Sequence, residues 1–141
     1  MEAKKQRILA ALVLLALGLG LAALTYFKTT GYKKPVAVIT GTKIKDRLLK
    51  KETDIYGNKD EERRQYLHVQ VLTGKYKGKT FETVNTYYPS QLVTQKYRAG
   101  ERVFVTVTAG SLALVSPKRD WILVMTLAIT LALTVAVVGR R

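Results

Sequence analysis

Two long stretches without formal charge constrain this chain more than any other feature. Residues 8–27 and 121–139 provide 20 and 19 consecutive positions without Asp, Glu, Lys or Arg. At a helical rise of about 1.5 Å per residue, about 20 apolar residues cross the ~30 Å hydrocarbon core of a bilayer. The sequence therefore predicts two transmembrane helices, with the 93 residues of segment 28–120 between them.

The central segment limits what the chain can fold into outside a membrane. Its 93 residues can build one small domain and no large catalytic core. The 141-residue chain contains no Cys, which excludes disulfides, thiolate metal sites and a Cys nucleophile.

Basic residues at positions 4–7 precede the first apolar stretch, as in a signal peptide or a signal anchor. A cleaved signal peptide has an apolar run of about 7–15 residues and a small-residue cleavage site, which residues 20–22 could supply. The run here is longer and continues through Tyr26 to Phe27, an aromatic pair suited to a membrane interface. An uncleaved anchor fits that length better.

Small and hydroxylated residues recur along both apolar stretches. Thr126, Thr130 and Thr134 are spaced by four and so share one helix face. Such residues allow close packing between transmembrane helices, and the partner would be the first span, with Gly18 and Ala22, or another protein. Alternatively, each Thr bonds the carbonyl four residues earlier and faces lipid.

The short termini favour one orientation in the membrane. Residues 1–7 and 140–141 together carry five basic residues, and two spans place both termini on one side. The positive-inside rule favours the cytoplasm for those termini only weakly, because the flanks of the central segment are nearly as basic. We expect cytoplasmic termini because the N-terminus is typical of an export signal. The central domain would then be extracytoplasmic.

Apolar residues alternate with polar ones along the central segment, as they do in half-buried strands. Five short runs rich in β-branched and aromatic residues are bounded by Gly, Asn or Pro. They predict a small antiparallel β-barrel of OB-like or SH3-like kind between the two helices. The expected strands cover residues 36–44, 65–72, 79–85, 103–108 and 112–115.

A charged arm over residues 46–64 interrupts this alternation. Twelve of its 19 residues are charged, six of each sign, which predicts a solvated hairpin arm or a flexible loop. Asp54, Asn58, Asp60 and Glu62 suggest a calcium loop, but Gly57 is misplaced for one and the last bidentate ligand is missing. We expect no metal site here.

The positive charge of the chain gathers on the rest of the central segment. The formal net charge is +14, and the arm contributes nothing to it. Lys75, Lys77 and Lys79 form the densest basic cluster, with Tyr76 among them. Basic residues interleaved with Tyr would suit nucleic acid in the cytoplasm. An extracytoplasmic domain would meet anionic lipids or envelope polymers instead, so nucleic acid is disfavoured; simple solvation of the charges is the other alternative.

Residues 69–85, VQVLTGKYKGKTFETVN, resemble the YibE/F-like membrane protein family. Its turn corresponds to residues 74–79, GKYKGK, and its strand-end Asn corresponds to Asn85. A later segment of the family is matched by Tyr97, Arg98, Gly100 and Val103, and Arg119 fits the position before the second span.

The resemblance implies a bacterial cell-membrane protein with an N-terminal helix and a small β domain. In the family these precede a multi-span, permease-like part, whereas this sequence ends at Arg141. We therefore expect the N-terminal module alone or a truncated form, without the permease-like activity. The candidate binding residues are Lys75, Tyr76, Lys77, Lys79, Asn85 and Arg98.

The inventory of reactive side chains does not favour catalysis. His68 is the only His and lies within an expected strand, and neither a P-loop nor a base beside any Ser is evident. We expect a non-enzyme without cofactors, acting as an accessory subunit of a multi-span membrane partner. The alternative is a membrane-tethered module that binds anionic lipid or envelope polymer.

Overall fold

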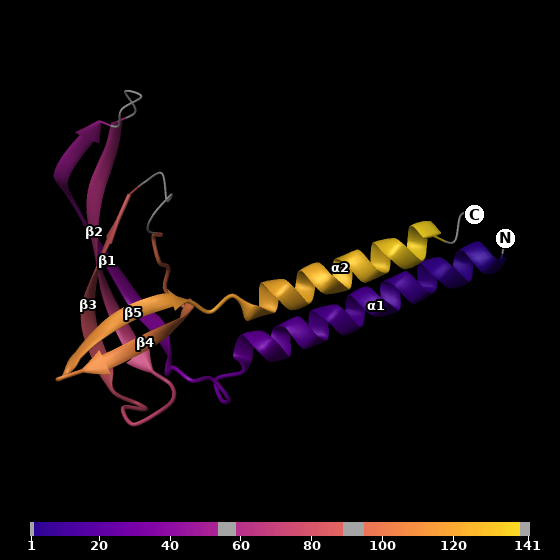
Figure 1. Cartoon of the computed structure of the whole chain (residues 1–141), viewed down its shortest axis with the longest axis horizontal. Helices are drawn as coiled ribbons and strands as arrows, with labels where there is room; N and C mark the ends of the chain where they lie inside the picture. Colours follow the sequence, from indigo (N-terminus) through magenta and orange to yellow (C-terminus); the bar gives the residue numbers. More distant parts are fainter. Residues whose placement is uncertain (1, 54–58, 89–94, 139–141) are drawn as a thin grey trace. The chain divides into compact units, whose positions relative to one another are not determined.

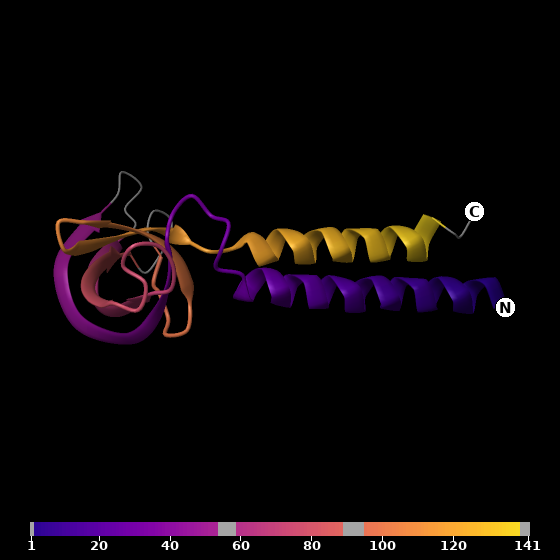
Figure 2. The same ribbon diagram turned by 90° about the horizontal axis from the view of Figure 1, so that it is seen from below.

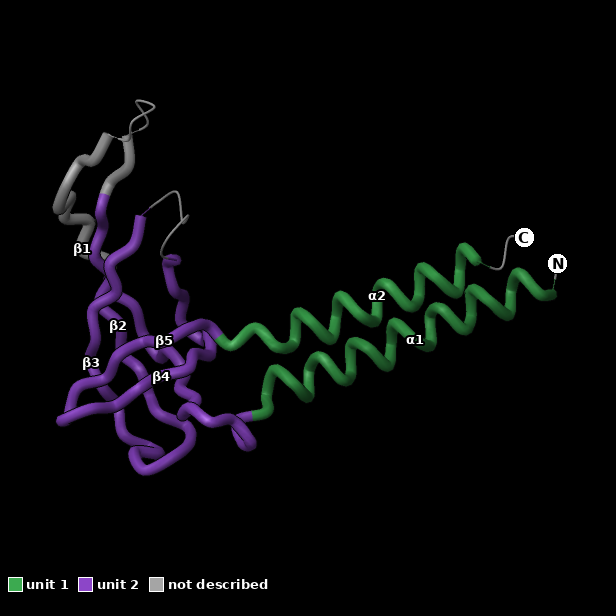
Figure 3. The backbone as a smooth tube through the Cα atoms, viewed as in Figure 1, with its two compact units in different colours: residues 1–28, 118–141 green, residues 29–117 purple. Residues whose placement is uncertain are grey.

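A computed structural model describes residues 2–53, 59–88 and 95–138 of the chain (Figure 1). Two helices enclose five strands in the sequence. The elements are α1 (Glu2–Phe27), β1 (Val36–Thr53), β2 (Lys59–Val71), β3 (Thr80–Tyr87), β4 (Arg102–Thr108), β5 (Ser111–Pro117) and α2 (Asp120–Val138). They form two compact units, Met1–Lys28 with Lys118–Arg141 and Thr29–Pro117 (Figure 3).

The helical unit consists of α1 and α2 lying side by side in both views (Figures 1 and 2). Each helix is long and apolar enough to cross a membrane, by length and composition. α1 begins at Glu2, six residues before the predicted apolar stretch, because Lys, Arg and Gln are good helix formers and extend it. α2 begins at Asp120, one residue before the predicted start.

The sheet unit is a nearly closed, barrel-like antiparallel sheet with strand order β3-β2-β1-β4-β5. Figure 2 shows it curled into a ring. β1 lies at its centre and pairs with β2 along most of its length, but with β4 only through Val36–Val38. The outer strands β3 and β5 approach each other, and the Thr83 hydroxyl donates a 3.0 Å hydrogen bond to the Leu112 carbonyl. That bond bridges the seam where the ladder does not close.

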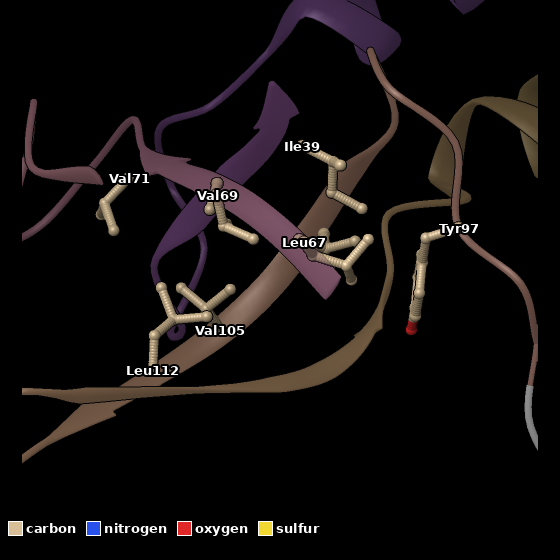
Figure 4. Packing of buried hydrophobic residues seen from close by; sticks show 9 residues of the cluster. Ile39, Leu67, Val69, Val71, Tyr97, Val105 and Leu112 are labelled. Atoms are coloured by element: carbon tan, nitrogen blue, oxygen red, sulfur yellow. The ribbon is translucent and has the colours of Figure 1, made fainter. Parts of the chain in front are cut away.

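The core of the sheet unit follows the predicted alternation. Leu67, Val69 and Val71 of β2 are buried, whereas His68 and Gln70 between them are partly exposed. Period-two alternation sends these two sets to opposite faces of the strand. The buried cluster shown in Figure 4 comprises Ala37, Ile39, Leu67, Val69, Val71, Tyr97, Val103, Val105 and Leu112.

All five predicted strands are present, but the first two are longer than expected and continue into the charged arm. After a register shift between Lys45 and Lys50, the backbones pair again from Lys50 opposite Glu62 to Thr53 opposite Lys59. In this register Lys50 lies opposite Glu62, whereas Glu52 lies opposite Asp60, so complementary charge alone does not account for the pairing. The paired backbones agree with the hairpin alternative predicted for the arm. Gly57 and Asn58, the expected centre of the arm, lie outside the described residues.

Candidate functional site

The turn between β2 and β3 is built around two glycines. Gly74 and Gly78 have φ angles of +82° and +85°, a region that costs residues with a Cβ about 1–2 kcal/mol. The amide of Lys77 donates to the Gly74 carbonyl at 3.1 Å, and that of Gly78 donates to the Val71 carbonyl at 2.8 Å. A Cβ on Gly74 would lie 3.3 Å from Pro35 Cγ, so this glycine also allows a close approach. The turn is therefore held in one defined conformation.

Tyr76 anchors this turn to the core and gathers two lysines around its ring. Its half-buried side chain packs on the core cluster and meets Phe81 edge to face, with the ring centroids 6.2 Å apart. The Nζ atoms of Lys75 and Lys79 lie 5.8 and 5.7 Å from the Tyr76 ring centroid, within cation–π range. Lys75, Lys77 and Lys79 are all exposed. Tyr76 therefore attaches the turn to the core, whereas the three lysines place positive charge on the surface.

Asn85 belongs to a polar clip in which a buried Gln from β2 holds the segment before β4. The Gln65 side chain is fully buried; its Nε2 donates to the Tyr97 carbonyl and its Oε1 accepts from the Tyr97 amide at 3.0 Å. Asn85 Nδ2 donates to Gln65 Oε1 at 3.4 Å and to the Gln95 carbonyl at 2.8 Å. These side-chain hydrogen bonds hold residues 95–97, which belong to no strand, against β2 and β3. They keep the Tyr97 side chain in the core.

These features coincide with a recognised domain. The sequence profile described as the YibE/F family N-terminal domain matches residues 30–115, more than half of the chain and nearly the whole sheet unit. The chain belongs to the YibE/F family. No curated protein and no solved structure gives a significant match to it.

Arg98 is not brought together with the lysines of the YibE/F turn. It is exposed and follows Tyr97, which the clip fixes opposite Gln65. Gln65 lies six residues before Val71 along β2, or roughly 20 Å at about 3.3 Å per residue. The six candidate binding residues therefore divide into the turn, the clip residue Asn85 and the separate Arg98.

Of the predicted helix-packing residues of this YibE/F chain, those of α1 lie in the contact between the two helices and those of α2 lie outside it. Gly18 and Ala22 are buried between the helices, and a Cβ added at Gly18 would overlap the Ala128 methyl. The glycine thus permits close approach of α1 and α2.

The threonines of α2 make the hydrogen bonds of the second alternative and do not pack on α1. The hydroxyls of Thr126, Thr130 and Thr134 donate to the carbonyls four residues earlier at 2.8–2.9 Å, and all three residues are exposed. Ala128 and Ala132 face α1 instead. Packing of the threonine face against another protein stays a prediction.

A buried lysine at the end of the helical unit was missed by the sequence reasoning. The Lys118 side chain is 1% exposed, and its Nζ lies 2.8 Å from Asp120 Oδ1. Nζ also donates to the carbonyls of Thr25 and Tyr26, in the last turn of α1, where carbonyls lack intrahelical partners. Lys118 thus joins the C-terminal end of α1 to the N-terminal end of α2.

Aromatic rings gather at that same end of the helices. Tyr26 meets Phe27 and Trp121 edge to face, with centroids 5.2 and 6.3 Å apart. Rings of this kind are enriched at membrane–water interfaces.

His68 makes an ordinary surface contact on β2. Its Nδ1 lies 3.3 Å from Glu82 Oε1, directly across the β2–β3 ladder, and the Glu82 side chain is 81% exposed. Both residues line a shallow groove of about 230 Å³ with Lys43 and Tyr66. Among residues 2–53, 59–88 and 95–138, no three His, Asp or Glu side chains gather where a metal could bind.

Proposed function

We propose that this YibE/F chain is a two-span membrane protein and a non-catalytic accessory subunit of a multi-span, permease-like membrane partner. Both termini would be cytoplasmic and the β domain extracytoplasmic. The five-stranded, partly open antiparallel barrel, in which β1 pairs with both β2 and β4, supports an OB-like assignment for that domain.

The observation that carries the proposal is the outer surface of the helix pair. Large apolar side chains point away from the contact between α1 and α2; Leu24 is 69% exposed and Leu123 is 74% exposed. Water solvates such a surface poorly, whereas lipid chains or another apolar helix cover it. The aromatic rings and the Lys118 contacts at one end of the helix pair suit a membrane–water boundary, because the charged groups and free helix-end carbonyls there have hydrogen-bond partners.

The threonine face of α2 supports a helical partner in particular. Thr126, Thr130 and Thr134 lie on the side of α2 opposite Ala128 and Ala132, which face α1. Short side chains let a second helix approach, and each hydroxyl oxygen can still accept one hydrogen bond.

Site-directed photo-crosslinking in native membranes tests this partner. A photoreactive residue at Thr130 should give one discrete adduct containing a multi-span protein. The same residue at Ile129, also exposed but on the flank of α2, should give little of that adduct. Equal adducts at both positions, or only dimers of this chain, would reject the subunit role.

A second function has its own observation, the exposed lysines on the ordered YibE/F turn. Lys75, Lys77 and Lys79 would make the β domain a tethered module for anionic lipid or envelope polymer. Replacing the three with Gln should weaken binding and flatten its salt dependence. An unchanged salt profile would eliminate this function.

A further inference from the structure

Two further lysines lie at the same end of the barrel as the three lysines of the YibE/F turn. Lys33 and Lys34 directly precede Pro35, whose ring adjoins Gly74. The Val36 amide donates to the Thr73 hydroxyl at 2.9 Å, and the Leu72 amide donates to the Val36 carbonyl at 2.8 Å. These contacts tie the start of β1 to the turn after β2.

Both segments are held in place, so the charges they carry form a defined surface. The ring of Tyr32 meets Phe104 edge to face, with centroids 5.2 Å apart, and fixes the chain before Lys33. Residues 31–36 and 72–80 contain five lysines and no acidic residue. We call this surface the basic end; it comprises the exposed residues Lys33, Lys34, Lys75, Lys77 and Lys79.

The chain joins both apolar helices to this end of the barrel. β1 begins at Val36, which pairs with Phe104, and Phe104 pairs on its other side with Ser116, next to the end of β5. Pro117 precedes Asp120 of α2 by three residues, a reach of at most about 11 Å. This end of the barrel is therefore the end from which the chain leads directly into both proposed spans.

We propose that the basic end binds anionic phospholipid headgroups of the bilayer that α1 and α2 cross, through ion pairs between lysine ammonium and lipid phosphate. The inference rests on the proposed two-span function and deepens its second form by naming the ligand and the residues. Charge complementarity carries the choice of lipid, because residues 31–36 and 72–80 present five lysines without a carboxylate and an anionic bilayer is a dense source of fixed negative charge. Each lysine near an anionic membrane contributes about a fivefold gain in affinity.

The experiment uses the full chain in nanodiscs of phosphatidylcholine with increasing phosphatidylglycerol. Backbone amide shifts of residues 72–80 report the mole fraction of phosphatidylglycerol at half-maximal change. Replacing Lys75, Lys77 and Lys79 with Gln should raise that mole fraction at least about twofold, or abolish the change up to pure phosphatidylglycerol. Salt should weaken the wild-type response, because the contacts are exposed.

The control removes the same charge from other exposed positions of the barrel. Lys43→Gln, Arg64→Gln and Lys96→Gln lie away from the basic end, opposite or beside residues of β2 and β3. This triple variant should respond to phosphatidylglycerol like the wild type. An equal loss in both triple variants would overturn the proposal, because net charge and not the basic end would then govern binding.

Two further outcomes separate this inference from its foundation. Rapid solvent exchange of amides within α1 and α2 in nanodiscs would contradict the two-span function itself. Protected helices without any phosphatidylglycerol response would overturn the lipid inference alone. A response to added polyphosphate in phosphatidylcholine discs, with none to phosphatidylglycerol, would replace lipid by a soluble polymer.

Discussion

Gln65→Leu should destabilise the β domain more than any other single replacement of a polar side chain in β2. Leucine preserves the approximate volume, but it removes the hydrogen bonds that Gln65 makes with the Tyr97 amide, the Tyr97 carbonyl and Asn85. Each buried polar group left without a partner costs about 1–3 kcal/mol, and the added apolar surface offsets part of this. The net loss in unfolding free energy should be about 2–4 kcal/mol.

Amide hydrogen exchange in the full chain measures this loss residue by residue. When reclosing is fast, exchange of core amides such as Val105 follows the opening free energy, so their rates should rise about 30- to 700-fold. The exchange rate of the Tyr97 amide should rise at least as much, because this amide donates to Gln65 Oε1 and the variant lacks that acceptor. Gln70→Leu is the matched control, because Gln70 lies on the same strand but is partly exposed. This replacement should change the unfolding free energy by no more than about 0.5 kcal/mol. Equal exchange rates of the Val105 and Tyr97 amides in the two variants would refute a stabilising role for the Gln65 hydrogen bonds.

Three further substitutions test other contacts. Gly18→Leu should separate α1 from α2 and alter the fluorescence of the single tryptophan, whereas Gly20→Leu, with open space around it, should not. Gly74→Ala should lower the unfolding free energy, measured in urea, by about 1–2 kcal/mol from backbone strain and by somewhat more from the contact of its Cβ with Pro35. Gly78→Ala has the same strain without a neighbouring atom, so equal losses in the two variants would exclude a contribution from the Pro35 contact. Lys118→Met should cost about 1–3 kcal/mol in the association of the helix ends, because Asp120 and the carbonyls of Thr25 and Tyr26 lose a charged hydrogen-bond donor. An unshifted thermal transition of tryptophan emission would contradict this.

Patterns of short range in the sequence predicted most of the architecture. The two charge-free stretches predicted the helices because length and hydropathy are local properties. Alternation predicted β2 and its buried residues Leu67, Val69 and Val71 for the same reason. The strands continue into the charged arm, as its hairpin alternative implies, but the ends of the two strands were not predicted because the arm lacks alternating apolar residues to mark them.

Contacts between distant residues were beyond these patterns. Lys118 bonds a carbonyl 93 residues earlier, so nothing near it in the sequence marks it as buried. Gln65 had a usable signal: it shares the inward phase of Leu67, Val69 and Val71, and a polar residue in that phase needs a buried partner. Its partner Tyr97, 32 residues later, could not be named from the alternation alone.

The YibE/F turn combines two roles that substitution can separate. Gly74, Gly78 and Tyr76 set its conformation and attach it to the core, whereas the lysines at its surface contribute charge with little packing. A glycine or tyrosine variant that loses a function therefore says nothing about binding until its stability is known. A lysine variant that keeps the exchange protection of Val105 and still loses the function assigns that function to charge. The net charge of +14, taken over the whole chain, suited nucleic-acid binding. Its effect on binding has to be tested at individual lysines of the turn, where charge can be removed without removing core contacts.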